Sequence, residues 1–124
     1  MSSTAALVVD DDDAIRRLIA SLLRRAGFVP VHTACDGQEG LDMMTAHTYR
    51  VVILDLRMPH VSGYDVLNEL AAHPLPSMPK IVVATADRSE VSDNLSADLV
   101  TAVIPKPFEA ETLISAARSC LDMG

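Results

Sequence analysis

The sequence predicts an α/β domain in which five parallel strands alternate with five helices, a (βα)5 chain whose helices cover both faces of one doubly wound sheet. Five short apolar runs, rich in β-branched residues, have the composition of buried parallel strands. Several segments between these runs place apolar residues at helical spacing. The length of 124 residues and apolar content of 49% suit one domain with one core. We expect residues 1–4 to be a disordered tail and residues 5–122 to form the domain.

The first strand is predicted over residues 5–9, and a clear amphipathic helix follows it. Asp12 or Asp13 can cap the start of this helix, and Gly27 is a suitable stop. The apolar stripe of the helix recurs at i, i+3, i+4, i+7 and i+8 and consists of Ile15, Leu18, Ile19, Leu22 and Leu23.

A second strand is predicted over residues 28–34, where Pro30 favours a position at the sheet edge because proline has no N–H to donate. The helix after it is weakly patterned and is marked by Leu41, Met44 and His47. Residues 51–54 then form a continuous apolar run that ends at Asp55. A carboxylate at the carboxyl end of such a buried strand lies where open α/β sheets bind their ligands.

The second half of the chain continues the alternation after a turn at residues 59–63. The predicted elements are a helix over residues 64–70, a strand over residues 81–85, a weak helix over residues 88–97, a strand over residues 99–104 and a final helix over residues 113–121. The connection over residues 73–79 contains three prolines and has no helical potential.

Composition excludes several classes of function. The net charge of −7 and the absence of a basic run argue against binding to a nucleic-acid backbone, and 3% aromatic residues provide no stacking platform. Cys35 and Cys120 are best interpreted as reduced thiols, not as a disulfide framework. No apolar run approaches the ~18 residues of a membrane span, and the first residues lack a basic signal-peptide region. We therefore expect a cytoplasmic protein with no membrane partner.

Five chemically important side chains follow predicted strands, and parallel strands bring their carboxyl ends to one edge of the sheet. They are Asp10, Asp11, Asp55, Thr85 and Lys106. Carboxylates ~4 Å apart repel by about 4 kcal/mol at an effective dielectric of 20, so a divalent cation is expected among them. All-oxygen ligands suit Mg²⁺ or Mn²⁺. A cation, a lysine and a hydroxyl around one aspartate form a site suited to phosphoryl transfer.

Four segments in this order, VVDDDDAIR, ILDLRMPHVSG, VVATAD and IPKPF, resemble the receiver domain of two-component response regulators. The resemblance spans residues 5–122, and each segment ends a predicted strand. It implies a flavodoxin-like fold and a signalling domain that catalyses only its own phosphorylation and dephosphorylation. A sensor histidine kinase or a histidine phosphotransfer protein would donate the phosphoryl group. The phosphorylated domain would act on an effector protein or a fused output domain, or would relay the group.

The resemblance also implies a role for individual residues. Asp55 is expected to accept the phosphoryl group. Asp11 matches a direct metal ligand, Asp10 an acid acting through water, and the backbone carbonyl of Arg57 the remaining protein ligand. Thr85 matches the hydroxyl that turns toward the phosphoryl group.

Lys106 matches the lysine that pairs with the phosphoryl group, and the Lys106–Pro107 peptide is expected to be cis. Three residues before this lysine, the family commonly has Tyr or Phe, whereas this chain has Val103. Because valine has no ring to move inward when Thr85 turns, we expect output through other contacts, or a phosphate relay that needs little switching.

Arg57 and Asp87 each lie two residues beyond a site residue, so both are expected at the rim of the pocket. Two interpretations stay open. The pair could hinder the water that hydrolyses the acyl phosphate, or it could be an exposed pair worth under ~1 kcal/mol with no kinetic effect.

The sequence disfavours three other functions. A receiver-like binding module that no longer takes phosphate is disfavoured because Asp11, Asp55 and Lys106 are all present. A flavodoxin-like enzyme or nucleotide binder would need a glycine-rich loop after the first strand, where this chain has four aspartates. A zinc site is disfavoured because the histidines show no HxH or HExxH spacing; they are His32, His47, His60 and His73. The length fits both a stand-alone protein and a module of a longer regulator.

Overall fold

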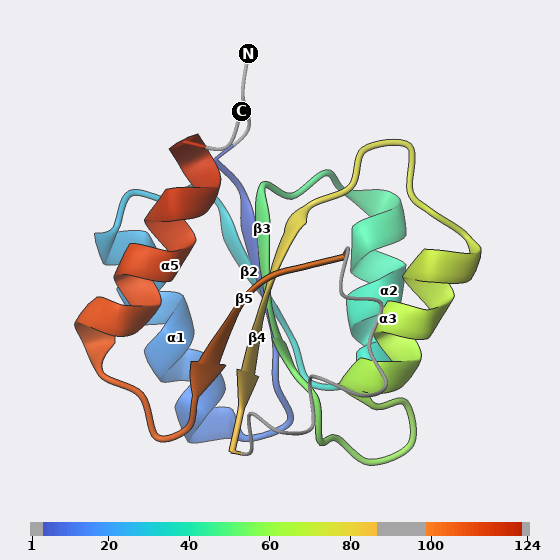
Figure 1. The fold of residues 1–124 in the computed structure, drawn as a ribbon, viewed down its shortest axis with the longest axis horizontal. Helices are drawn as coiled ribbons and strands as arrows, with labels where there is room; N and C mark the ends of the chain where they lie inside the picture. Colours follow the sequence, from blue (N-terminus) through green and yellow to red (C-terminus); the bar gives the residue numbers. More distant parts are fainter. Residues whose placement is uncertain (1–3, 87–98, 123–124) are drawn as a thin grey trace.

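The computed structural model describes residues 4–86 and 99–122, and it confirms the predicted α/β class. Five parallel strands form one sheet in the order β2-β1-β3-β4-β5, with α1 and α5 on one face and α2 and α3 on the other (Figure 1). The elements are β1 Ala6–Val9, α1 Asp13–Arg25, β2 Val31–Ala34, α2 Gly37–Ala46, β3 Val51–Asp55, α3 Gly63–Ala72, β4 Lys80–Thr85, β5 Val100–Pro105 and α5 Ala110–Asp122. The helix predicted over residues 88–97 and most of the predicted tail lie outside the described residues.

The strand burial follows the position of each strand in the sheet. Every residue of β1 and β3 is buried, as expected for central parallel strands covered by helices on both faces. The edge position predicted from Pro30 is confirmed, because β2 pairs with β1 alone and begins one residue after the proline. Just before this edge strand, Thr4 forms an antiparallel bridge with Val29.

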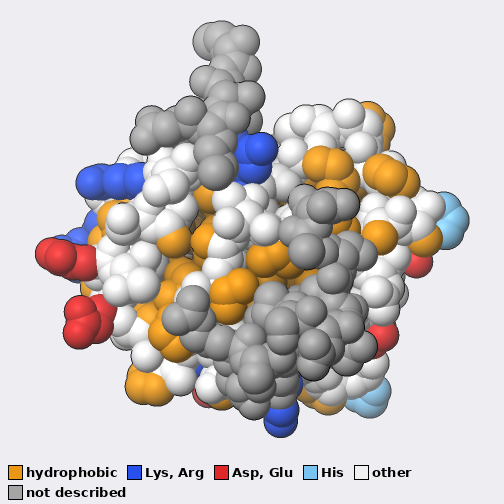
Figure 2. All heavy atoms as spheres, viewed as in Figure 1, with side chains coloured by type: hydrophobic (Ala, Val, Ile, Leu, Met, Phe, Trp, Pro, Cys, Tyr) orange, Lys and Arg blue, Asp and Glu red, His pale blue; other side chains and the backbone are white. Residues whose placement is uncertain are grey.

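The other edge of the sheet, β5, is less buried: its first four residues are half-buried. Figure 2 shows hydrophobic side chains gathered near the centre of the face that carries α5 and β5. The core is mainly aliphatic, with Phe28 and Tyr49 as its buried aromatic residues, and divides into two clusters, one on each face of the sheet. The cluster under α1 and α5 centres on Ile19, Ile53 and Leu113, and the cluster under α2 and α3 on Leu54 and Leu67.

The prediction is wrong for one residue of the apolar stripe of α1. Leu18 is 51% exposed, whereas Ile19, Leu22 and Leu23 are buried as predicted and Ala20 joins them. At about 100° per residue, the buried arc centres between Ile19 and Leu23, so Leu18 lies roughly 120° from its middle. An apolar side chain at that angle is left facing solvent.

Both cysteines are free thiols, as predicted, with Cys35 exposed and Cys120 buried. Over the described ranges, no helix combines the length and apolar character that a membrane crossing requires.

Candidate functional site

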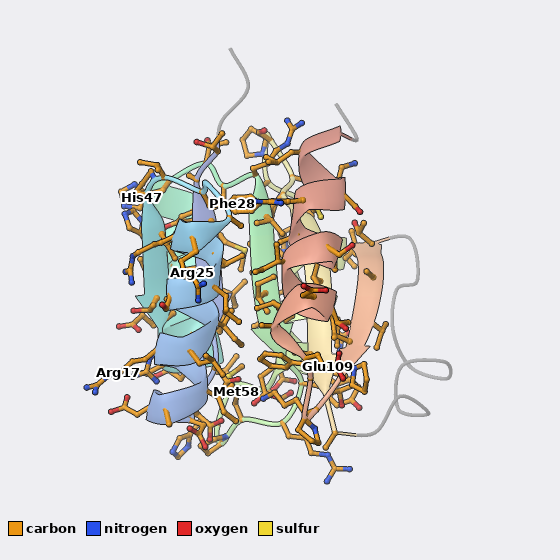
Figure 3. All side chains as sticks on the ribbon, turned by 90° about the vertical axis from the view of Figure 1, so that its left-hand side faces the viewer. Arg17, Arg25, Phe28, His47, Met58 and Glu109 are labelled. Carbon is orange, nitrogen blue, oxygen red and sulfur yellow. The ribbon has the colours of Figure 1, made fainter. Side chains whose placement is uncertain are left out.

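A pocket of about 240 Å³ lies at the carboxyl ends of the strands. Figure 3 shows this end of the sheet near Met58, which follows β3 by three residues. The structure brings most of the predicted site residues together here: the pocket is lined by Asp10, Asp11, Asp55, Arg57 and Lys106, with Asp12, Ile15 and Ala86. These side chains come from parts of the chain almost a hundred residues apart, because the parallel strands end side by side.

The turn after β1 positions the first two carboxylates. Asp10 is 1% exposed, and its Oδ1 accepts a hydrogen bond from the backbone N–H of Asp12 at 2.9 Å. Asp11, next to it, is exposed. Asp12 itself caps α1 by accepting from the N–H of Ile15 at 3.0 Å, which confirms the capping prediction. The turn therefore separates a buried acid, an exposed acid and a helix cap.

Asp55 is the last residue of the buried strand β3, and it is 7% exposed. Its Oδ1 accepts a weak hydrogen bond from the backbone N–H of Arg57 at 3.3 Å. Burial raises the pKa of Asp55 from 3.8 to about 6, and the charges of Asp10 and Asp11 add to this rise. Lys106 and the Arg57 N–H act in the opposite direction but do not cancel it.

Gly63 lets the first turn of α3 approach the end of β3. A Cβ on this residue would lie 2.2 Å from the carbonyl oxygen of Asp55 and 2.7 Å from the Cα of Leu56. Both atoms belong to the backbone, so neither can rotate away. A residue without a side chain is therefore required beside the pocket.

Lys106 brings a positive charge to the acidic cluster. Its Nζ lies 2.8 Å from Asp10 Oδ2 and 3.5 Å from Asp55 Oδ1. Burial alone would lower the pKa of Lys106, but the hydrogen bond and charge of Asp10, together with Asp55, raise it above its ordinary value. The Lys106–Pro107 peptide is cis, as the resemblance implies. The backbone N–H of Lys106 donates to the carbonyl of Thr85 at 2.8 Å, so β4 and β5 hold the lysine at the site.

Thr85 and Val103 are not among the residues that line the pocket. Thr85 is buried at the end of β4 and does not line the pocket, whereas the next residue, Ala86, does. Val103 pairs with Val83 in the sheet and packs, half-buried, against the core cluster under α2 and α3. Asp87 lies outside the described residues, so its predicted position opposite Arg57 stays a prediction.

The donor set suits a hard divalent cation. Carboxylate oxygens from Asp10, Asp11 and Asp55 lie within 4.8 Å of one another, which is close enough for one ion to contact them. All three ligands are oxygens, the preference of Mg²⁺. Burial, and to a smaller extent the charges of Asp10 and Asp11, raise the pKa of Asp55, and a cation bound among these carboxylates would act against this rise.

One residue at this site was missed from the sequence. Arg16, in the first turn of α1, donates from Nη1 to the carbonyl oxygen of Asp10 at 2.9 Å and also pairs with Asp13. Its side chain is only 15% exposed. One feature of the sequence could have indicated this role: Arg16 lies about one turn into the helix that follows the acidic residues. From there a long side chain can extend back to the backbone of Asp10.

Comparison with known proteins points to one family. The response regulator receiver domain family matches residues 6–118. The transcriptional regulatory protein SrrA of Staphylococcus aureus is 34% identical over 90 residues, which are 73% of this chain and 36% of SrrA. The probable transcriptional regulator ycf27 of Cyanidium caldarium is 41% identical over 64 residues, which are 52% of this chain and 25% of that protein. This chain thus spans about a third or less of these relatives.

Solved structures share the fold over nearly their whole length. The response regulator TrrA of Thermotoga maritima, solved in complex with Mg²⁺-BeF, is 32% identical with a TM-score of 0.81, covering 94% of this chain and 97% of that one. The chemotaxis protein CheY4 of Vibrio cholerae is 28% identical with a TM-score of 0.85, covering 96% of this chain and 99% of that one.

Proposed function

The chain belongs to the response regulator receiver domain family, whose members accept a phosphoryl group on an aspartate in two-component signalling, and we propose that Asp55 is the acceptor in this chain. The observation that carries the proposal is the position of this carboxylate. Asp55 ends a buried strand, faces a pocket, and lies 3.5 Å from the ammonium group of Lys106. Its neighbours Asp10 and Asp11 supply the other two carboxylates of the acidic cluster.

In the proposed reaction, a carboxylate oxygen of Asp55 attacks the phosphorus of a phosphohistidine donor. The new O–P bond forms as the P–N bond breaks, and the imidazole nitrogen of the donor keeps the electron pair and takes up a proton. The ammonium of Lys106 lies 3.5 Å from the acceptor carboxylate of Asp55, close to where the phosphoryl group arrives. Its positive charge therefore offsets the negative charge of the phosphoryl oxygens. The hydroxyl of Thr85 is proposed to turn toward the phosphoryl group afterwards.

Receiver domains bind Mg²⁺ at an acidic cluster, and we propose Asp11, Asp55 and the Arg57 carbonyl as its ligands here, with Asp10 in support through water. Mn²⁺ shares the same oxygen preference and is proposed as a substitute. When bound, the ion supplies Lewis-acid stabilisation of the phosphoryl oxygens. The protein residues position the acceptor oxygen and the lysine.

The domain is a signalling module, and its catalysis is proposed to be limited to its own phosphorylation and dephosphorylation. We propose a sensor histidine kinase or a histidine phosphotransfer protein as the donor, in the cytoplasm. SrrA and ycf27 carry the names of transcriptional regulators. By analogy, an effector protein or a fused output domain is the proposed recipient of the signal.

Val103 shapes the proposed output. Its side chain packs against the core cluster under α2 and α3, where it has no ring to carry a movement of Thr85 across β5. We therefore propose that phosphorylation is read through contacts near the pocket, or is relayed onward. Large NMR shifts along β5 on beryllofluoride binding, comparable with those at Asp55, would contradict this.

The function is tested by incubating the protein with acetyl phosphate and Mg²⁺ and measuring its intact mass. We expect one phosphoryl group per chain, removed by alkaline hydrolysis as an acyl phosphate is. The Asp55→Asn variant and a sample with chelator should show none. Asp42→Asn, which changes an exposed acid on α2, serves as the matched control and should be phosphorylated normally. Phosphorylation that persists in Asp55→Asn would assign another acceptor.

A further inference from the structure

Three ring side chains meet at the opposite end of the sheet from the acidic pocket. His32 comes from the edge strand β2, His47 follows α2, and Tyr49 precedes β3. The ring centroids of His32 and His47 are 5.2 Å apart with an interplanar angle of 66°, and both rings also contact Tyr49 edge to face. Figure 3 shows His47 far from Met58, which lies near the acidic pocket. This cluster is therefore a separate feature.

Tyr49 fixes the orientation of one imidazole. Its hydroxyl lies 2.7 Å from Nδ1 of His32, and its side chain is buried. Burial raises the pKa of Tyr49, so the phenol stays protonated and neutral. In the tautomer with its proton on Nδ1, His32 donates to this hydroxyl and keeps the lone pair of Nε2. Metal-binding histidines are commonly oriented in this way, by a hydrogen bond to the ring nitrogen that is not a ligand.

The spacing of the two rings allows both imidazoles to bind one ion. A ring whose nitrogen is about 2.1 Å from zinc has its centre about 3.2 Å from the ion, so two such rings at the tetrahedral angle are about 5.2 Å apart. The observed separation of the His32 and His47 rings is 5.2 Å. We propose that His32 and His47 form a binding site for a divalent cation of the zinc class, with Tyr49 as a positioning residue.

The exposure of the two rings defines the character of the site. His32 is half-buried and His47 is exposed, so an ion held between them faces solvent on one side. Two protein nitrogens leave two tetrahedral positions for water or for a donor group from another molecule. The site therefore binds more weakly than a closed structural zinc site, and it links the end of α2 to the edge strand β2.

Sequence spacing could not reveal this pair, because its members come from a strand and a helix end that the fold brings together. Imidazole nitrogens favour zinc, nickel and copper, whereas the carboxylates at the other end of the sheet favour magnesium. The two ends of the domain are thus selective for different ions, and they can be tested in one protein sample.

The test is a Zn²⁺ titration followed by isothermal calorimetry and by NMR of the imidazole protons. A Cys35→Ser background removes the exposed thiol, and excess Mg²⁺ occupies the acidic cluster. We expect one Zn²⁺ per chain, with shifts confined to His32 and His47. Replacement of either residue by Gln should weaken binding about tenfold or more, and Tyr49→Phe should weaken it roughly tenfold while leaving both ligands in place.

His60 and His73 provide matched controls, since both lie outside the cluster and His73 pairs with Glu69. His60→Gln and His73→Gln should bind Zn²⁺ like the parent protein, and circular dichroism should show every variant folded. Binding that is unchanged in His32→Gln and His47→Gln, or lost in His73→Gln instead, would overturn the proposal. Undetectable Zn²⁺ binding by the parent protein would also overturn it.

Discussion

The two ends of the central sheet hold two clusters of titratable side chains that are built on opposite physical principles. At the carboxyl end, three carboxylates lie within 4.8 Å of one another and repel. At the amino end, two imidazoles and a phenol attract one another through ring contacts and a hydrogen bond of 2.7 Å. The same sheet therefore carries one cluster that opposes folding and one that supports it.

The difference indicates how a small domain combines chemistry with stability. The acidic cluster is held in place by groups that do not belong to it: the ammonium of Lys106, the N–H of Asp12 and the close packing of Gly63. The ring cluster needs no such support. Removing a charge from the acidic cluster should consequently raise the free energy of unfolding, whereas removing a contact from the ring cluster, or disturbing the packing at Gly63, should lower it. The predictions below test this in order of expected effect.

The largest effect is expected from Gly63→Ala, which disrupts the close packing of α3 against the end of β3 at the acidic pocket. The new methyl group would lie 2.2 Å from the carbonyl oxygen of Asp55, so α3 must move away from β3. We expect a loss of about 3 kcal/mol in the free energy of unfolding, measured by urea denaturation. Phosphorylation from acetyl phosphate should fall as well, because the backbone of Asp55 shifts.

Gly27→Ala is the control for this prediction. Gly27 has a φ of +102°, but nothing lies within 4 Å of a Cβ built there. Its substitution should therefore cost about 1 kcal/mol from backbone strain alone and leave phosphorylation unchanged. Equal losses at the two glycines would show that crowding at the pocket is not the dominant factor.

The second prediction concerns the pH dependence of stability without metal. The pKa of Asp55 is about 6 in the folded protein against 3.8 ordinarily, so the folded state binds this proton more tightly. The stability that follows is present below pH 4 and is lost as the pH rises through 6; of a total of about 3 kcal/mol, about 2 kcal/mol is lost between pH 4.5 and pH 7.5. Asp55→Asn removes this loss, so the variant should be the more stable protein at neutral pH.

Urea denaturation of both proteins in chelator, at pH 4.5 and pH 7.5, checks this prediction. The stability difference between Asp55→Asn and the parent should grow by about 2 kcal/mol toward the higher pH. Mg²⁺ should reduce the difference, because it relieves the repulsion. A difference that is the same at both pH values would mean that Asp55 is not held in a destabilising environment.

The third prediction applies the same measurement to the ring cluster. Tyr49→Phe keeps the ring contacts but removes the hydroxyl that bonds His32 Nδ1, so we expect a loss of about 1 kcal/mol. A double-mutant cycle with His32→Gln isolates the coupling between the two side chains, which should be about 1 kcal/mol and favourable. A gain in stability from Tyr49→Phe would show that the ring cluster, like the acidic cluster, does not stabilise the folded state.

Much of the acidic end could be predicted from the sequence because each of its main residues directly follows an apolar run. Asp10, Asp55 and Lys106 needed only the rule that parallel strands end on one edge. Arg16 was not predicted, because it lies within a helix and does not follow an apolar run, although its side chain contacts the backbone of Asp10. Thr85 follows the same rule, yet it is buried beside the pocket and does not line it.

The amino end could not be predicted, for a related reason. His32 lies within an edge strand, and His47 lies at the end of a weakly patterned helix, where neither spacing nor periodicity connects them. Leu18 shows a similar limit on a smaller scale. Its spacing fits the apolar stripe, but it is 51% exposed, because the orientation of the helix against the sheet decides which side chains are buried.

The smallest effect is expected at the rim of the acidic pocket. The exposed side chain of Arg57 lies at the pocket mouth, and an arginine there could restrict the water that hydrolyses the acyl phosphate. We predict that Arg57→Ala shortens the phosphorylated lifetime about threefold, a change under ~1 kcal/mol and typical of an exposed charge. Asp87→Ala should act in the same direction if the two side chains pair.

The lifetime is measured by loss of the phosphoryl group in Mg²⁺ after the donor is removed. Arg17→Ala, an exposed arginine on α1, is the matched control and should leave the lifetime unchanged. Unchanged lifetimes in both Arg57→Ala and Asp87→Ala would favour the exposed-pair interpretation. The rim would then have no measurable effect on the lifetime, which would depend on the groups inside the pocket, among them Asp10, Asp55 and Lys106.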